Sequence, residues 1–147
     1  MYYFAYGSNL SHKQMQKRCP GAEFLCIGIL HGYSRQFDGY SKQWRGAVAN
    51  IIPKNNSAVR GGLFRITSEH LQALDMYEGL GRLYDRQVLP IKVDGKATIK
   101  AIVYLRNPLP TGEPSPAYLS VIKDGLVDCG INDDSVSVRQ SRLELES

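Results

Sequence analysis

The chain has 147 residues, of which 43% are hydrophobic and 22% are charged, and its formal net charge is +4 at pH 7. These values are typical of a globular protein, and the length predicts a single domain over residues 1–147 with one core of ordinary size. The basic residues are scattered and form neither a run nor a stripe, which argues against nucleic-acid binding and leaves small anionic substrates open.

The chain contains three cysteines and three histidines, at Cys19, Cys26, Cys129, His12, His31 and His70. The cysteines are odd in number and lack paired spacing, which argues against a disulfide framework and against a zinc site. No apolar run reaches the length of a membrane span, and polar residues 7–9 interrupt the first apolar run. We therefore expect a cytoplasmic, reduced protein with no metal, no signal segment and no membrane association.

In the first half of the chain, the pattern predicts a strand over residues 1–6 that ends at a Gly-Ser-Asn loop. Ser11 is expected to cap a helix over 12–19, which Pro20-Gly21 ends. Further strands are predicted over 23–33, 35–40, 47–53 and 59–66. Gly28 and Gly32 inside the first of these predict bulges or a close backbone approach, and Asn55-Asn56 predicts a turn.

In the second half, Thr67 or Ser68 is expected to cap a helix over 68–78 that ends at Gly79 and Gly81. Strands over 84–93 and 98–105 flank Asp94-Gly95, which is a hairpin turn signal. A proline-rich loop precedes a helix over 116–129, and the tail 131–147 is predicted to be a helix capped by Asn132 that frays at its end. Strands outnumber helices, and the hairpins indicate antiparallel pairing. The pattern predicts an α+β fold with a barrel-like sheet and a few helices at its edge.

Glu78 falls on the apolar face of the predicted helix 68–78. Leu71, Leu74 and Glu78 follow the spacing i, i+3, i+7, whereas Asp75 and Glu69 fall on other faces and are expected to be solvated. A carboxylate above apolar neighbours loses hydration, so its pKa should rise towards the range of a general acid or base. The alternative is a solvated glutamate in the last turn of a helix.

The loop after the first strand also has two interpretations. Gly7 permits unusual backbone conformations, and the short side chains of Ser8 and Asn9 can bond to nearby backbone. Such a loop can direct several N–H groups towards one point and so hold an anion or a developing oxyanion. The alternative is an ordinary turn that returns Leu10 to the core. Ser8 lacks the sequence context of a covalent nucleophile.

"YFAYGSNL" at 3–10, together with Glu78 in "LDMYEG", closely resembles the γ-glutamylcyclotransferase-like family. The resemblance continues through "WRGAVANI" at 44–51, "GGLFRI" at 61–66, Tyr84 and "PSPAYLSVIKDG" at 114–125. It covers nearly the whole chain and leaves the C-terminal tail poorly matched. Members of the family fold as a small mixed, mostly antiparallel β-barrel flanked by helices, so the resemblance implies that fold here.

The resemblance implies an intramolecular acyl transfer without a cofactor. The α-amine of a γ-glutamyl compound attacks its own γ-carbonyl, and 5-oxoproline and a free amino acid leave. Glu78 would be the catalytic base that takes a proton from the α-ammonium and returns it to the departing amine. The residues implied to bind the substrate are Tyr6, Gly7, Ser8, Asn9, Leu10, Tyr84 and Tyr118. The implied partner is this small molecule, and the protein is expected to be a monomer or a homodimer.

Within the family, "YGSNL" resembles the branch that acts on γ-glutamyl amino acids. The glutathione-specific branch typically carries Leu after the Ser, and the γ-glutamylamine branch typically has a Gly-Thr-Leu loop. Three hypotheses stay open: the cyclotransferase, a related enzyme that removes γ-glutamyl groups from an amine or a biosynthetic intermediate, and a non-catalytic binding or stress-response module. The intact Glu78 disfavours the third.

Overall fold

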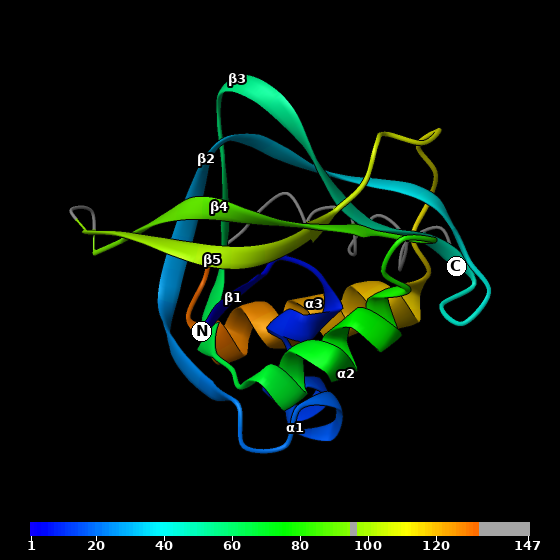
Figure 1. The fold of residues 1–147 in the computed structure, drawn as a ribbon. Helices are drawn as coiled ribbons and strands as arrows, with labels where there is room; N and C mark the ends of the chain where they lie inside the picture. Colours follow the sequence, from blue (N-terminus) through cyan, green and yellow to red (C-terminus); the bar gives the residue numbers. More distant parts are fainter. Residues whose placement is uncertain (95–96, 133–147) are drawn as a thin grey trace.

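Five strands close into a barrel in the order β1-β3-β2-β4-β5 in the computed structural model, which describes residues 1–94 and 97–132 (Figure 1). The strands are β1 (Tyr2–Ala5), β2 (Glu23–Ser41), β3 (Gly46–Arg65), β4 (Asp85–Val93) and β5 (Ala97–Leu105). Neighbouring strands run antiparallel, except that β1 and β5 run parallel, with Tyr3 opposite Ile102. The predicted α+β fold with a small mixed, mostly antiparallel barrel is confirmed.

β2 and β3 are two long strands where the sequence predicted four shorter ones. The turn predicted at Asn55-Asn56 does not reverse the chain, because the residues on both sides of it pair with β2: Pro53 with Tyr33 and Ala58 with His31. The extra residues form an irregularity in the ladder, and Asn56 absorbs it with a φ of 61°. A local turn signal was therefore overridden by continuous pairing with a neighbouring strand.

The two glycines inside the predicted strand 23–33 behave as expected. Gly32 has a φ of 84° and lies at the register shift between His31 and Tyr33, so it marks a bulge. At Gly28, an added Cβ would come within 2.5 Å of the Ile91 side chain on β4, so glycine is needed for the close approach of two strands.

The predicted caps at Ser11 and Thr67 and the predicted end at Gly79 are confirmed, and the structure adds Ser115 as the cap of the last helix. Ser11 caps α1 (His12–Arg18), Thr67 caps α2 (Ser68–Glu78) and Ser115 caps α3 (Pro116–Cys129). Gly79 and Gly130 end the last two in the left-handed conformation. Figure 1 shows the three helices grouped on one side of the barrel. In the described part of the chain, no helix combines the length and apolarity needed to cross a membrane.

Two sequence predictions fall partly or wholly on residues outside the described ranges. Beyond Asn132, the predicted C-terminal helix in 131–147 lies outside them, and so does Gly95 of the predicted Asp94-Gly95 hairpin turn. Asp94 itself has a φ of 52°, and β4 and β5 pair in register on both sides of this turn, from Val93 opposite Ala97 onward.

Helix α3 fixes the short 3₁₀ helix η1 (Ser8–Leu10), which follows β1. An added Cβ at Gly125 would come within 2.4 Å of the backbone atoms Leu10 C and Ser11 N, so α3 packs directly on the main chain of the loop. The Cys129 thiol donates a hydrogen bond to the Leu10 carbonyl oxygen at 3.5 Å. Leu10 is fully buried beneath the loop. The conformation of the loop therefore depends on the docking of α3.

We expect Gly125→Ala to destabilise the fold by about 1–3 kcal/mol, although alanine is the better helix former. The added methyl group meets rigid backbone, so α3 must move away from the loop. The measurement is the free energy of unfolding from urea denaturation. Gly112→Ala is the matched control, because its Cβ would meet the Ala47 side chain at an ordinary 3.4 Å. Equal stabilities of the two variants would contradict the packing described here.

Candidate active site

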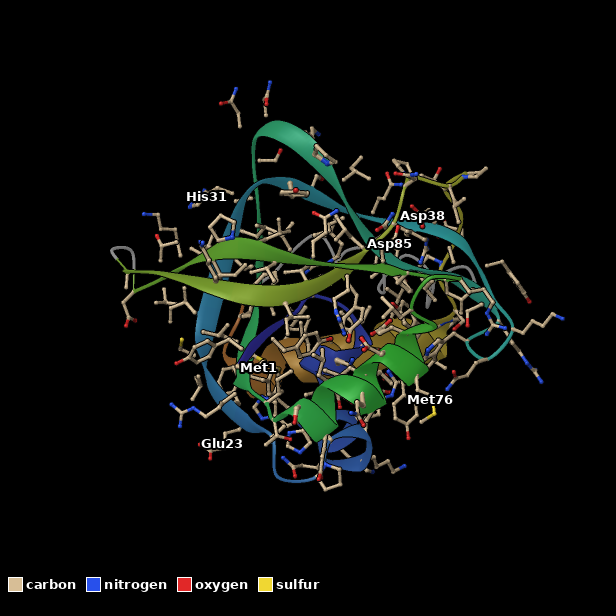
Figure 2. The ribbon with its side chains drawn as sticks, in the orientation of Figure 1. Met1, Glu23, His31, Asp38, Met76 and Asp85 are labelled. Carbon is tan, nitrogen blue, oxygen red and sulfur yellow. The ribbon has the colours of Figure 1, made fainter. Side chains whose placement is uncertain are left out.

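Glu78 is the last residue of α2 and faces the interior of the molecule. On the same helix, Leu74 is fully buried, whereas Met76 is 73% exposed and points away from the barrel (Figure 2). Burial raises the pKa of Glu78 to about 7, and the nearby Arg18 and Arg106 oppose this rise. The direction expected from the helical spacing is therefore confirmed. Near neutral pH, this carboxyl group can both accept and release a proton.

Asp75, one turn earlier on α2, differs from its prediction. It was expected to be solvated, but its side chain is only 22% exposed. It accepts a hydrogen bond from the Tyr104 hydroxyl at 2.6 Å and pairs with Arg86. The helical period alone could not show this, because both partners come from the barrel strands. Glu69 is exposed, as expected.

A cavity of about 720 Å³ opens beside Glu78. Among the described residues, Glu78 is the one carboxylate in its lining. The lining includes seven of the eight residues that the sequence singled out: Tyr6, Gly7, Ser8, Asn9, Glu78, Tyr84 and Tyr118. The exception is Leu10, whose side chain packs in the core beneath the loop. The barrel end thus brings together residues from β1, α2 and α3 that lie far apart in the sequence.

The side chain of Asn9 links the loop to Glu78. Its Nδ2 donates to the Tyr3 hydroxyl at 3.0 Å and lies 3.4 Å from Glu78 Oε1. Its Oδ1 accepts from Gln14 Nε2 at 3.0 Å and from Arg18 Nη1 at 3.1 Å. Asn9 is only 3% exposed, so the four contacts hold a buried amide in one place.

The backbone of the loop presents donors to the same cavity. The turn is closed by hydrogen bonds from Leu10 N to Gly7 O (3.0 Å) and from Ser11 N to Ser8 O (3.1 Å). The N–H groups of residues 7–9 stand at the open start of this turn and have no partner within the described residues. They are available to an anion or a carbonyl oxygen in the cavity.

The main chain of Ala49 forms hydrogen bonds with both Tyr84 and Tyr118. The Tyr84 hydroxyl donates to the Ala49 carbonyl at 2.7 Å, and the Ala49 N–H donates to the Tyr118 hydroxyl at 2.8 Å. A Cβ at Gly7 would come within 3.2 Å of Ala49 Cβ, so the loop passes close to the same segment. Burial raises the pKa of Tyr84 to about 12 and that of Tyr118 further, so both stay uncharged at neutral pH.

Three arginines that the sequence patterns did not indicate line the cavity: Arg18, Arg82 and Arg106. Arg18, at the end of α1, bonds to Asn9 and lies 4.8 Å over the ring of Tyr77. Arg106, directly after β5, lies 4.3 Å over the ring of Tyr84 and forms an ion pair with the buried Asp38. The i, i+4 spacing of Gln14 and Arg18 was the one available signal, since it places both on one face of α1.

Asp38 anchors Arg106 from the end of β2. Burial favours the neutral form of this carboxyl group, but hydrogen bonds from Asn50 and Gln36 and the charge of Arg106 outweigh it and lower its pKa. Asn50 also accepts from Arg106 N at 3.2 Å and donates to Arg106 O at 3.1 Å. This network fixes the wall behind Tyr84. In the described part of the chain, no group of three His, Cys, Asp or Glu side chains could hold a metal ion.

The protein is a small closed mixed barrel, and the cavity at its end contains one carboxylate with a raised pKa. The family model described as "Gamma-glutamyl cyclotransferase, AIG2-like" matches residues 3–124. The chain therefore belongs to this family.

Curated relatives and solved structures agree with this assignment. The mouse protein named gamma-glutamylcyclotransferase is 33% identical over an alignment of 137 residues, and the match covers 88% of this chain and 71% of the relative. The human protein of the same name is 31% identical over the same shares. A solved structure named gamma-glutamyl cyclotransferase superposes with a TM-score of 0.88 at 26% identity and covers 95% of this chain and 86% of that one.

We expect Glu78→Gln to be more stable than the wild type at pH 8, by about 1–3 kcal/mol. The pKa of this group rises from 4.5 to about 7 on folding, so the folded state holds the neutral acid more tightly than the unfolded state does. The stability of the wild type should therefore fall as the pH rises from 4.5 through 7.

Urea unfolding at pH 5 and pH 8 measures this difference, which should be small at the lower pH. Glu69→Gln removes an exposed carboxylate from the same helix and is the matched control. The stability of Glu78→Gln minus that of the wild type is compared at the two pH values. If this difference were smaller at pH 8 than at pH 5, the carboxylate would not be desolvated.

Proposed function

We propose that this protein is a γ-glutamylcyclotransferase. It converts γ-glutamyl amino acids, or related γ-glutamyl amides, to 5-oxoproline and the free amino acid or amine. The observation that carries the proposal is a single cavity-lining carboxylate with a pKa of about 7, which shares the cavity with the loop at residues 6–9 in a chain of this family.

In the proposed reaction, Glu78 first accepts a proton from the α-ammonium group of the substrate. The freed amine attacks the γ-carbonyl carbon of the same molecule, and a new C–N bond closes the five-membered ring. Glu78 gives this proton to the leaving nitrogen as the bond between that nitrogen and the carbonyl carbon breaks. The ring nitrogen gives up its second proton, which the departing amine takes up, so that a neutral lactam and an ammonium group result. Nucleophile and electrophile belong to one molecule, so the cavity mainly has to hold it folded. Orientation can supply about 7–11 kcal/mol of the barrier, and a proton-shuttling carboxylate can supply about 10²–10⁴-fold in rate.

The pKa of Glu78 supports this double role. At a pKa of about 7, the carboxylate and the acid are both well populated at neutral pH, so neither taking nor returning the proton is strongly uphill. A glutamate with its ordinary pKa of 4.5 would be a weak base for an ammonium group.

The loop and the tyrosines supply the proposed binding groups. The free N–H groups of Gly7, Ser8 and Asn9 would bind the γ-glutamyl carboxylate or the carbonyl oxygen that becomes negative in the transition state. Tyr6 and Tyr118 would form the neutral wall, with Tyr84 less directly involved. Their raised pKa values support roles in shape and hydrogen bonding rather than in proton removal.

We also propose the cytoplasm as the compartment and a monomer or homodimer as the assembly. The three cysteines are free, as expected in a reducing compartment. Size-exclusion chromatography with light scattering decides between the two assemblies.

We expect Glu78→Gln to lower the release of 5-oxoproline from γ-glutamyl-alanine by at least about 10²-fold. Gln is nearly isosteric but cannot accept the proton, so folding and ligand binding should persist. The measurement is 5-oxoproline release by the purified variant, beside calorimetric binding of the substrate. Glu69→Gln should retain wild-type turnover. Turnover by Glu78→Gln at the wild-type rate would refute the assignment of the base.

We expect a higher kcat/KM for γ-glutamyl-alanine than for glutathione. The Asn9 side chain holds the loop through donor and acceptor contacts that a leucine at this position could not make. The "YGSNL" loop resembles the branch that acts on γ-glutamyl amino acids, and we propose that branch here. A side-by-side kinetic comparison of the two substrates tests this, and equal or higher efficiency on glutathione would show that the branch is wrong. An analogue that lacks the α-amine should bind without reacting.

A further inference from the structure

The amide of Asn9 has a defined orientation between α1 and Glu78. On one side, its oxygen receives N–H donors from Gln14 and Arg18, and on the other its NH₂ group faces the Tyr3 hydroxyl and Glu78 Oε1. Arg18 is itself held against α2, because its guanidinium lies 4.8 Å over the ring of Tyr77, the neighbour of Glu78.

Arg18 is the contact that prevents this amide from turning over. A guanidinium group has N–H donors and no acceptor, so it cannot form a hydrogen bond with an NH₂ group. Gln14 could turn its own amide and offer an oxygen instead, although it would lose the donor that bonds to Ser8 Oγ at 2.7 Å. A turned Asn9 would therefore leave the donors of the half-buried Arg18 and the buried Asn9 facing each other, which is costly.

The orientation of Asn9 determines which oxygen of Glu78 can carry a proton. The NH₂ group next to Oε1 can only donate, so a proton on Oε1 would find no acceptor there. If the amide were turned, its oxygen would accept a hydrogen bond from a protonated Oε1. That contact would stabilise the neutral acid and hold the proton away from the cavity.

We propose that Arg18 is a positioning residue of the reaction: through Asn9 it keeps an N–H donor on Glu78 Oε1, so that Oε2 carries the proton in transit. The inference rests on the proposed function. Oε2 takes a proton from the α-ammonium group, and the amine nitrogen bonds to the γ-carbonyl carbon. Oε2 gives this proton to the leaving nitrogen as its bond to that carbon breaks, and the second proton of the ring nitrogen passes to the departing amine, which leaves as an ammonium group. Glu78 ends as the carboxylate that it was at the start.

The other groups that face Glu78 do not change their charge over the working pH range. They are Tyr3, Tyr6, Tyr84, Tyr104, Tyr118 and Arg106. Burial raises the pKa of each of these tyrosines, so they remain neutral, and a guanidinium group remains charged. A change in the titration of Glu78 in an Arg18 variant therefore reports on Arg18 and the amide that it holds.

The first test compares kinetics with γ-glutamyl-alanine across pH 5–9. Arg18→Met should lower kcat by about 10- to 100-fold with KM nearly unchanged, and should shift the acid limb of the pH profile to higher pH. Arg18→Lys keeps a charged donor and should recover part of the loss. Lys17→Met removes a neighbouring exposed cation that does not line the cavity, and should behave as the wild type.

A double-mutant cycle separates the amide from the direct effect of the charge. Part of the effect of Arg18 on Glu78 comes directly from its charge. If the rest acts through Asn9, then Arg18→Met should change kcat and shift the acid limb clearly less in an Asn9→Ala background than in the wild-type background. If it acts through its charge alone, the shift of the acid limb should be the same in both backgrounds, and that result would overturn the proposal.

The second test needs no substrate. A ¹³C NMR titration of the Glu78 side-chain carboxyl group should show its pKa raised by about one unit in folded Arg18→Met relative to Lys17→Met. The same titration in the Asn9→Ala background should show a clearly smaller rise, because only the direct effect of the charge remains there. If the wild type releases no 5-oxoproline, the proposed function fails, and the titration still decides the inference. Identical titrations of Arg18→Met and the wild type would refute it.

Discussion

The parallel pairing of β1 with β5 is the constraint on which the site depends. It is the one parallel contact among the described strands, and it closes the barrel with the carboxyl ends of both strands at the same rim. The chain leaves β1 there as the loop at residues 6–10 and leaves β5 there at Arg106. The Tyr6 hydroxyl bonds directly to the Tyr104 carbonyl at 2.5 Å, which joins the two exits. An antiparallel closure would have placed them at opposite ends.

Glu78 is kept in this rim at a cost in stability, and its neighbours limit that cost. Desolvation of the carboxylate is the largest influence on its pKa, and Arg18 and Arg106 offset it only in part. Each arginine has a different partner: Arg106 pairs with Asp38, and Arg18 bonds to Asn9. A direct ion pair would hold Glu78 as a permanent carboxylate. The arrangement instead leaves it close to balance between the acid and the base.

The remaining walls of the cavity are rigid because backbone groups hold them. Ala49 on β3 bonds to two tyrosines through the two sides of its main chain, and α3 packs on the loop backbone at Gly125. Hydrogen bonds to main-chain atoms vary little in geometry, since strand pairing already fixes those atoms. A reaction in which the substrate attacks itself gains most from such a fixed cavity, because its barrier depends on how well one conformer is held.

The sequence by itself determined the features that depend on near neighbours in the chain. Ser11, Thr67, Gly79 and Gly130 set the helix ends through local hydrogen bonds and backbone conformation, and the i, i+3, i+7 spacing placed Glu78 on the inner face of α2. The family resemblance added which residues gather around that glutamate.

Only the tertiary structure decided those features that depend on contacts between distant segments of the chain. The Asn55-Asn56 signal lost to the continuous pairing of β2 with β3, and Asp75 found partners on the barrel strands. Leu10 turned into the core beneath α3, and Arg18 and Arg106 reached the cavity through Asn9 and Asp38. Each of these outcomes depends on contacts between residues far apart in the chain, whose energies no local pattern contains.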